Sequence, residues 1–368
     1  MGRAEDLAGG AGGGGMKAVV LAGGRGTRLR PLSHTMPKQL VPVAGVPVLF
    51  HCLRNIGAAG ITETAVVVGS HAERIRSAVG DGAAFGLEVT YLRQEAPLGL
   101  AHGVAIARDF LGDDDFVLYL GDNMLAGGIA DLAAEFADGR PDALIAVAKV
   151  DNPSDYGTAE VRPDGRVTGV FEKDRRSRFD LAMLGVYFFT PAVHEAIGSV
   201  PASERGEHEI TDAIQWLIEQ GAHVRASAYR AYWKDTGRLD DLLACNSELL
   251  DRAEGSIEGL VDEDSELHGA VTVAPGARVI RSRITGPVHI GPNALVRDSD
   301  ITSSTSIGAD CVVHRSEVGY SILLDGAHLS GVRAVHGSII GGGTRVIRTS
   351  GKHRLIVGDD CIIHLGDE

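Results

Sequence analysis

The stretch that decides the fold of most of this chain is AVVLAGGRGTRLRP, residues 18–31. Its first six residues, AVVLAG, are apolar and rich in β-branched valine, which predicts a buried β-strand. This strand runs directly into Gly23, Gly24 and Gly26, which are followed by Thr27 and Arg28. Glycines let the backbone approach a phosphate closely and turn its N–H groups inward. We therefore predict an anion-binding loop at the end of this strand.

The residues around the loop carry no acid. From Leu7 to Thr62 there is no Asp or Glu, although the chain holds 49 acids and has a formal net charge of -14. The same stretch holds six basic residues, namely Lys17, Arg25, Arg28, Arg30, Lys38 and Arg54. An acid-free, basic segment in an acidic protein is suited to hold an anion. The acidic chain as a whole is not expected to bind nucleic acid, because such proteins show a basic stripe or tail.

Short apolar runs and helical segments alternate along the first two thirds of the chain. The strand-like runs are AVVLAG, TAVVVG, EVTYL, FVLYLG, ALIAVA and MLGVYFF. Between several of them lie amphipathic segments such as VLFHCLRNIGAAG, HAERIRSAVGDG and GGIADLAAEFADG. This alternation predicts a Rossmann-like α/β domain with a mostly parallel sheet covered on both faces. Ligands of such sheets bind at the carboxyl ends of the strands, where the glycine loop lies.

The last third of the chain has a different pattern. Apolar residues recur at six-residue steps in two offset series, the first being Ile284, Ile290 and Val296 and the second Leu295, Ile301, Ile307 and Val313. Hexapeptide spacing predicts a left-handed parallel β-helix, with a small β-sandwich as the alternative. We predict a disordered Gly-rich extension over residues 1–15, the α/β domain over 16–245, an acidic linker over 246–262 and the β-helix over 263–368.

Several protein classes are disfavoured by composition. No apolar run approaches the roughly 20 residues that cross a bilayer, so we expect no membrane partner. The N-terminus lacks a charged segment followed by an apolar one, and we predict no signal peptide. The four cysteines are scattered without a CxxC pair: Cys52, Cys245, Cys311 and Cys361. This spacing favours a reduced, cytoplasmic location over a disulfide framework or a zinc site.

A second motif, PKQLVPV at residues 37–43, follows the glycine loop. Arg28 can contact phosphate oxygens in a bidentate manner, and Lys38 supplies a more mobile positive charge. The loop is not a Walker A loop, because no Lys-Ser or Lys-Thr follows its last glycine. Nor does it read GxGxxG, which disfavours a dinucleotide-dependent oxidoreductase.

Together, LAGGRGTRLRP at residues 21–31 and KQLVPV at residues 38–43 resemble the nucleotide-binding signature of sugar nucleotidyltransferases. The KQL form and the hexapeptide tail are similar to the long bacterial glucose-1-phosphate thymidylyltransferases. The resemblance covers nearly the whole chain from Met16. It implies a Mg²⁺-dependent enzyme that joins dTTP to glucose-1-phosphate, releases pyrophosphate, and feeds deoxysugar or antibiotic biosynthesis. The proposed reaction is an in-line attack of the sugar-phosphate oxygen on the α-phosphorus.

The resemblance also implies roles for individual residues. Those implied to bind the nucleotide are Leu21, Gly23, Gly24, Gly26, Thr27, Gln39, Gln94 and Gly99. Those implied to act on the reacting phosphates are Arg28, Lys38 and Lys173. Those implied to hold the sugar are Tyr156, Gly157, Glu172, Met183 and Trp233, and the implied metal ligands are Asp122 and Asp235. The chain departs from the family at Asp174, where Glu-Lys-Pro is usual, and this places a negative charge beside Lys173.

Alternative functions remain open at this point. One is another sugar-1-phosphate nucleotidyltransferase with UTP or GTP as donor. Another is a second, acyltransferase activity in the β-helix, for which the candidate bases are His289, His314, His328 and His336. The β-helix can also serve only for structure or assembly, and we expect a homo-oligomer.

Overall fold

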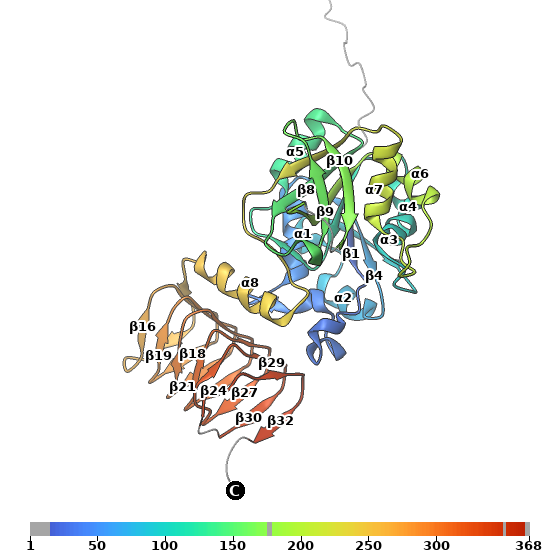
Figure 1. Ribbon diagram of the computed structural model, residues 1–368. Helices are drawn as coiled ribbons and strands as arrows, with labels where there is room; N and C mark the ends of the chain where they lie inside the picture. Colours follow the sequence, from blue (N-terminus) through green and yellow to red (C-terminus); the bar gives the residue numbers. More distant parts are fainter. Residues whose placement is uncertain (1–14, 175–178, 349–350, 365–368) are drawn as a thin grey trace, which may run out of the picture.

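A computed structural model describes residues 15–174, 179–348 and 351–364 of the chain. It has two domains, with helix α8 (Leu239–Asp251) lying between them (Figure 1). The predicted disordered extension, apart from Gly15, lies outside the described residues. Within the described ranges, none of the helices is both long enough and apolar enough to span a membrane.

The first domain is built on a nine-stranded sheet. Its strands are β1 (Lys17–Ala22), β4 (Glu63–Val68), β5 (Glu88–Arg93), β6 (Phe116–Leu120), β8 (Ala143–Lys149), β9 (Gly157–Val161), β10 (Val167–Glu172), β11 (Leu181–Phe189) and β12 (Val224–Ala228). The six strands predicted from apolar runs are confirmed as β1, β4, β5, β6, β8 and β11. The order β5-β4-β1-β6 is parallel throughout, and β8 is parallel to β12. Between these groups, β11 runs antiparallel to β6 and β8.

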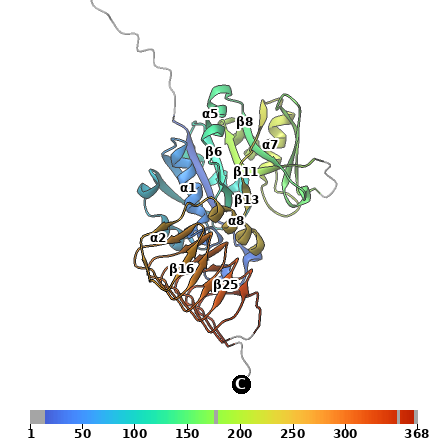
Figure 2. The same cartoon turned by 90° about the vertical axis from the view of Figure 1, so that its left-hand side faces the viewer.

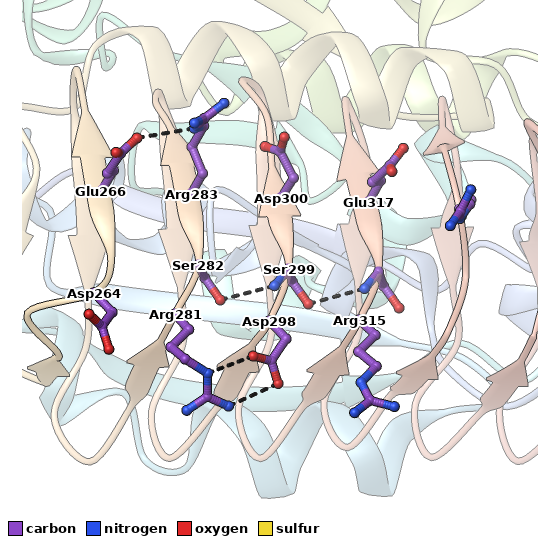
Figure 3. A pocket seen from close by; sticks show the side chains of 12 residues that line it. Asp264, Glu266, Arg281, Ser282, Arg283, Asp298, Ser299, Asp300, Arg315 and Glu317 are labelled. Carbon is purple, nitrogen blue, oxygen red and sulfur yellow. Dashed lines mark hydrogen bonds and ion pairs between the residues drawn. The ribbon is translucent and has the colours of Figure 1, made fainter.

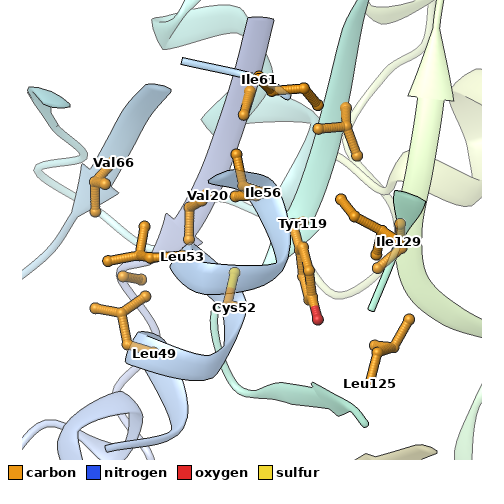
Figure 4. Close-up of a cluster of buried hydrophobic side chains, with 14 of the residues drawn as sticks. Val20, Leu49, Cys52, Leu53, Ile56, Ile61, Val66, Tyr119, Leu125 and Ile129 are labelled. Atoms are coloured by element: carbon orange, nitrogen blue, oxygen red, sulfur yellow. The ribbon is translucent and has the colours of Figure 1, made fainter. Parts of the chain in front are cut away.

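Helices cover both faces of this sheet, as predicted. They are α1 (Val48–Ala58), α2 (Ala72–Val79), α3 (Leu100–Ile106), α4 (Arg108–Leu111), α5 (Ala130–Gly139), α6 (Ala192–Ser199) and α7 (Ile210–Glu219). Along β1, Ala18 and Val20 face the cluster with α1, α2 and α5, whereas Val19 faces the cluster with α3, α6 and α7. Figure 4 shows Leu49, Cys52, Leu53 and Ile56 of α1 packed toward Val20 and Tyr119. Burial on both faces explains why the runs that form β1, β4, β6 and β8 are apolar without alternation.

Several shorter elements lie near the carboxyl edge of β1. They are the 3₁₀ turns η1 (Thr27–Leu29), η2 (Leu32–His34), η3 (Lys38–Leu40) and η5 (Pro153–Asp155), and the strand pairs β2 (Pro42–Val43) with β3 (Val46–Pro47) and β7 (Asn123–Leu125) with β13 (Trp233–Asp235). A further 3₁₀ turn, η4 (Ala83–Phe85), lies at the opposite edge, before β5. Because β1 and β6 are parallel neighbours, the segments that follow them emerge at the same edge. This places the glycine loop beside Asp122.

The second domain is a three-sided parallel β-helix, which confirms the predicted fold class. One side consists of β14 (Ser256–Ile257), β17 (Val271–Val273), β20 (Val288–Ile290), β23 (Thr305–Ile307), β26 (Ile322–Leu323), β29 (Ile339–Ile340) and β31 (Ile356–Val357). The second consists of β15 (Leu260–Val261), β18 (Arg278–Ile280), β21 (Leu295–Arg297), β24 (Val312–His314), β27 (His328–Ser330), β30 (Arg345–Ile347) and β32 (Ile362–His364). The third consists of β16 (Glu266–His268), β19 (Arg283–Thr285), β22 (Asp300–Ile301), β25 (Glu317–Gly319) and β28 (Val335–His336).

The buried residues of the β-helix explain why two offset series are visible in the sequence. The inward positions are Ile284, Ile290, Val296, Ile301, Ile307, Val313 and Val318. Their spacing is six, six and then five residues, because Ile284 pairs with Ile301 one coil later. The inclusion of Leu295 in an inward series is wrong, since Val296 fills the interior and Leu295 is half-buried. One of the three sides of each coil is one residue shorter than the others. The six-residue spacing therefore restarts one position earlier in the next coil, which gives two offset series.

The boundary between the domains also differs from the predicted one. Helix α8 crosses it at residue 245, and β14 and β15 lie within the residues assigned to a linker. A side view places α8 between the two domains (Figure 2). One buried cluster joins them, comprising Leu29, Leu32, Val41, Val43, Val48 and Met124 of the first domain, Leu242, Leu243 and Cys245 of α8, and Ile322, Leu324 and Ile339 of the β-helix. Two-residue strands carry too little pattern to be recognised in sequence.

Candidate active site

The glycine loop lies beneath the side chain of Lys38. A Cβ atom on Gly24 would lie 3.2 Å from Lys38 Cε, and one on Gly26 would lie 3.2 Å from Lys38 Cβ. Gly26 also has a φ of 61°, which disfavours other residues. Ser33 Oγ donates a hydrogen bond of 2.6 Å to the Gly26 carbonyl and holds the turn. The loop therefore needs glycine both for its backbone conformation and for the approach of Lys38.

Lys38 forms an ion pair with Asp122, which follows shortly after the end of β6. Burial lowers the pKa of Lys38, but the charge and hydrogen bond of Asp122 outweigh it, so the pKa lies above its ordinary value. Burial likewise raises the pKa of Asp122, and Lys38 reverses the shift, leaving this pKa below its ordinary value. Both groups are therefore charged at neutral pH, as expected for a closely paired couple.

Asp235 lies next to this pair because β13 is paired with β7. The register places Asp235 opposite Asn123, the residue after Asp122. Thr236 strengthens the junction, since its N–H and its Oγ1 donate to the Asp122 carbonyl at 3.1 and 2.7 Å. Burial and the negative charge of Asp122 raise the pKa of Asp235 to about 6. Two carboxylates that disfavour each other's charge are suited to share a cation.

The donor set formed by Asp122 and Asp235 fits Mg²⁺ better than a transition metal. Among the described residues, no group of three or more His, Cys, Asp or Glu side chains is placed to hold a metal. Mg²⁺ is commonly held by one or two carboxylates together with water and substrate phosphates. Zinc would need more protein ligands, usually His or Cys.

Arg28 approaches the same carboxylates from η1. A Cβ atom on Gly237 would lie 2.8 Å from Arg28 Nη2 and 3.1 Å from Asp235 Oδ1, so both side chains border Gly237. Arg28, Asp235, Tyr156 and Trp233 line one cavity of about 350 Å³. Trp233 Nε1 donates to Asn123 Oδ1 at 2.9 Å and to the Leu184 carbonyl at 3.1 Å, which fixes the indole ring.

The largest group of predicted residues lines a neighbouring cavity of about 280 Å³. Its predicted residues are Leu21, Gly23, Gly24, Lys38, Gln39, Gln94, Gly99, Asp122, Glu172 and Lys173. The structure thus brings the ends of β1, β5, β6 and β10 around one space. Gly26, Thr27, Gly157 and Met183 line neither cavity, although a Cβ atom on Gly157 would lie 2.6 Å from Met183 Cε.

Two glutamines present amide groups in or beside this cavity. Gln39 is 1% exposed, and its Oε1 has no hydrogen-bond partner among the described residues. A buried acceptor without a partner is costly unless a ligand satisfies it. Gln94 is held by its own Nε2, which donates to the Gly99 carbonyl at 3.2 Å and lies 3.0 Å from His102 Nδ1. His102 was not predicted from the sequence.

Glu172 is held by residues that the sequence did not single out. Its Oε1 accepts from Arg205 Nη2 at 3.2 Å and from Lys173 Nζ at 3.0 Å, and its Oε2 accepts from Thr211 Oγ1 at 3.3 Å. Arg205 also pairs at 2.6 Å with Glu209, which is buried and lines the cavity. The only sequence signal for this network is a lone arginine among the glutamates of SERGEHE, residues 203–209.

The four histidines proposed for a second activity are dispersed over the β-helix. His289 lies against Gly45 of the first domain, where a Cβ atom would be 2.6 Å from His289 Cδ2. His336 packs on Tyr320 with ring centroids 5.7 Å apart. His314 Nε2 is 3.5 Å from Asp298, and burial lowers the pKa of His328. These positions show no shared cavity for the four side chains among the described residues.

A cavity of about 580 Å³ lies on the outer face of the β-helix (Figure 3). Acidic and basic side chains alternate along one row of its lining (Asp264, Arg281, Asp298 and Arg315), where Arg281 makes two hydrogen bonds of 2.8 and 3.1 Å to Asp298. Beneath them, Ser299 N–H donates to Ser282 Oγ at 3.1 Å, and Ser316 N–H donates to Ser299 Oγ at 3.2 Å. These contacts link successive coils of the β-helix.

Comparison with known proteins agrees with this geometry. The profile of the family described as nucleotidyl transferase matches residues 17–252. The chain is 51% identical over 354 residues to a glucose-1-phosphate thymidylyltransferase of Streptomyces antibioticus, covering 95% of this chain and 99% of that protein. It is 50% identical over 347 residues to one of Streptomyces griseus, covering 94% and 98%. A solved Bacillus anthracis structure assigned to the same enzyme superposes with a TM-score of 0.60 at 30% identity, covering 63% of this chain and 94% of that one. The chain belongs to the nucleotidyl transferase family.

Proposed function

We propose that this protein is a glucose-1-phosphate thymidylyltransferase, which joins dTTP and glucose-1-phosphate to form dTDP-glucose and pyrophosphate. The observation that carries the proposal is a single cavity lined by the glycine loop, by Lys38 and Asp122, and by Glu172 and Lys173. A phosphate-binding loop and a second cationic group thus border one space. The near full-length similarity to the two Streptomyces enzymes supports this choice of substrates.

The reaction needs no general base, because a sugar-phosphate dianion is already a competent nucleophile. Catalysis then depends on positioning the two phosphates and offsetting their charge. The raised pKa of Lys38 keeps its ammonium group charged, and Arg28 adds a guanidinium beside Asp235. We propose that these two cations stabilise the charge of the departing pyrophosphate.

Asp122 and Asp235 are the proposed ligands of Mg²⁺. When bound there, the ion would supply positive charge to the triphosphate. Asp122 is already ionised at neutral pH, and Asp235 becomes ionised above about pH 6. Thr236 and Asn123 hold Asp122, because Thr236 binds its carbonyl and Asn123 Nδ2 donates to its Oδ1 at 3.3 Å.

The sugar phosphate is proposed to bind at Lys173 and the sugar hydroxyls at Glu172. Lys173 has a φ of 44°, and its N–H donates to the Tyr156 carbonyl at 3.2 Å. This bond fixes the backbone of Lys173, immediately before the position where the family proline is replaced by Asp174. Arg205 and Thr211 orient the Glu172 carboxylate. Tyr156 and Trp233, whose rings are 5.2 Å apart, form the proposed wall for the sugar.

The nucleotide base is proposed to bind between Gln94 and Gly99, with Gln39 near the deoxyribose. The unpartnered Oε1 of the buried Gln39 supports a polar ligand at this end of the cavity. The Gln94 amide is fixed by Gly99 and His102, so its orientation is set before a base arrives. Fixed amides of this kind read hydrogen-bonding edges with little entropic cost.

The direct test is a pyrophosphate-release assay over a grid of dTTP, UTP, GTP, ATP and CTP against several sugar-1-phosphates, in Mg²⁺. We expect the highest kcat/KM for dTTP with glucose-1-phosphate. A higher value with UTP or GTP would change the assigned donor, and no release with any pair would contradict the proposed enzyme. The Asp122→Asn variant is the internal control, since it should bind nucleotide without turnover.

We also propose a cytoplasmic location, because all four cysteines are free thiols, and a role in deoxysugar biosynthesis, which consumes dTDP-glucose. A homo-oligomer is expected as well. Size-exclusion chromatography with light scattering on the full chain measures its mass and tests this last expectation.

A further inference from the structure

The β-helix packs against the back of the segment that supplies three residues of the proposed active site. We call residues 27–48 the loop segment; it contains Arg28, Lys38 and Gln39. The apolar residues of this segment share one buried cluster with the β-helix: Leu29, Leu32, Val41, Val43 and Val48 on one side, and Ile322, Leu324 and Ile339 on the other. In Figure 1 this segment, drawn in blue after β1, extends toward β29.

Neighbouring residues of the loop segment face opposite ways. Leu29 is fully buried in the shared cluster, whereas the adjacent Arg28 borders Asp235 and Gly237. Val41 is also fully buried in the cluster, while Lys38 and Gln39 line the active-site cavity of about 280 Å³. The loop segment is therefore a thin layer between the β-helix and the ligand space.

Asn246 of α8 forms a three-way polar connection in the same place. Its Oδ1 accepts from the Ala44 N–H at 2.9 Å and from Ser306 Oγ at 2.6 Å. Its Nδ2 donates to the Ser304 carbonyl at 3.0 Å. Asn246 is fully buried, so each bond is shielded from water. Ala44 is at the tip of the β2–β3 hairpin, which follows η3, so Asn246 links this hairpin to Ser304 and Ser306 of the β-helix.

Further contacts join the loop segment to the β-helix. Thr35 Oγ1 donates to the Asp359 carboxylate of the last coils. Gly358 packs on Pro31, because a Cβ atom there would be 3.5 Å from Pro31 Cβ. His289 also lies against Gly45, so the β-helix contacts the loop segment both around η2 and at the β2–β3 hairpin.

We propose that the β-helix is a positioning domain for the nucleotide half of the active site. Ile322, Ile339 and Asn246 act through the loop segment, which they hold so that Arg28, Lys38 and Gln39 meet the triphosphate and its sugar. The sugar-phosphate side is supplied by Glu172 and Lys173 at the end of β10, outside the loop segment. This inference rests on the proposed function for its kinetic readout.

Adjacent isoleucines provide a matched test. Ile339 and Ile340 are both fully buried in β29, but Ile339 belongs to the shared cluster and Ile340 to the interior of the coil. Ile339→Ala should lower kcat about 10-fold or more and raise KM for dTTP, because small displacements of positioning groups are costly. Its KM for glucose-1-phosphate should stay near the wild-type value. Ile340→Ala should lower Tm to a similar degree and keep kcat near wild type, and Ile339→Val should restore most of the lost rate.

Asn246→Ala provides a second variant in case Ile339→Ala does not fold, and it should show the same kinetic split. Equal kcat losses in the Ile339 and Ile340 variants, or a larger change in KM for glucose-1-phosphate than for dTTP, would overturn the proposal. If the wild-type protein itself shows no turnover, the proposed function fails, and amide hydrogen exchange of residues 38–48 then decides. Faster exchange in Ile339→Ala than in Ile340→Ala supports positioning, and equal exchange overturns it.

Discussion

At the scale of single residues, the candidate active site depends on charges that are held close together away from water. Lys38 and Asp122 stabilise each other's ionised forms, whereas Asp235 is left beside a second carboxylate. Such a cluster is expected in a site that binds a cation, because the fold holds the two carboxylates together although their charges repel each other. The metal-free protein therefore carries an electrostatic cost at Asp235.

That cost predicts a pH-dependent effect of Asp235→Asn. The pKa of Asp235 is raised from 3.8 to about 6 in the folded protein, so its stabilising contribution is full below about pH 4 and is lost as pH rises through 6. At pH 8 without divalent metal, the variant should be more stable than wild type by up to about 3 kcal/mol. Below pH 4 this advantage should vanish.

Urea unfolding with EDTA at the two pH values measures the difference; equal stability at pH 8 would contradict the electrostatic account. Added Mg²⁺ should stabilise wild type and not the variant.

Arg28 gives a second prediction at this scale. Arg28→Ala should lower kcat by about 10²-fold or more, since it removes the guanidinium that we propose stabilises the departing pyrophosphate. Arg54→Ala is the matched control, because Arg54 belongs to the same acid-free segment but is exposed on α1. Pyrophosphate release by the two variants, with thermal unfolding to confirm the fold, tests the assignment. Similar rates for both would remove Arg28 from the reaction.

At the scale of elements, close backbone approaches bring the site together. Gly99 precedes α3 with a φ of 104°, and a Cβ atom there would lie 2.6 Å from the His208 N–H nitrogen. The same segment is pinned by hydrogen bonds from His208 N to the Leu98 carbonyl, 2.7 Å, and from Ala101 N to the His208 carbonyl, 3.0 Å. The loop before α7 and the start of α3 thus enclose the side of the cavity where we propose that the base binds.

We expect Gly99→Ala to be much more harmful than Gly60→Ala. Gly60 also has a positive φ, 79°, but no heavy atom lies within 4 Å of its would-be Cβ. Gly60→Ala should therefore cost only about 1 kcal/mol, from backbone strain. Gly99→Ala adds a clash with backbone and displaces the carbonyl that holds Gln94, so KM for dTTP should rise as well. Chemical unfolding and steady-state kinetics of both variants test this; equal effects would show that the close approach is unimportant.

At the scale of the whole molecule, the two domains share a buried cluster and should unfold together. Both tryptophans, Trp216 and Trp233, belong to the first domain, so their fluorescence reports on it alone. Far-UV circular dichroism reports on both domains. We expect the two signals to give coincident transitions in wild type. Ile339→Ala should separate them, because it weakens the shared cluster, whereas Ile340→Ala should leave them coincident. Separate transitions in wild type would contradict this coupling.

Much of this protein was determined by local sequence. The runs that became β1, β4, β6 and β8 are recognisable because strands buried on both faces are continuously apolar. Lys38 lies 12 to 15 residues after the glycines of the loop, and the hexapeptide spacing follows from one inward residue on each side of a coil. In each case the residues that form the pattern lie within a short stretch of sequence.

Only the tertiary structure decided the rest. Asp122 and Asp235 meet because β7 pairs with β13 across more than a hundred residues, and Arg205 reaches Glu172 from a separate loop. Leu295 and Val296 are both apolar, so the sequence alone does not show which of them faces the interior. The answer depends on which side of the coil has a five-residue spacing between inward residues. The loop segment joins two domains through side chains that look like ordinary core residues in sequence. Such contacts leave no local pattern in the sequence. Each residue type shows only that the side chain can be buried or can form an ion pair, and the fold determines which residue it contacts.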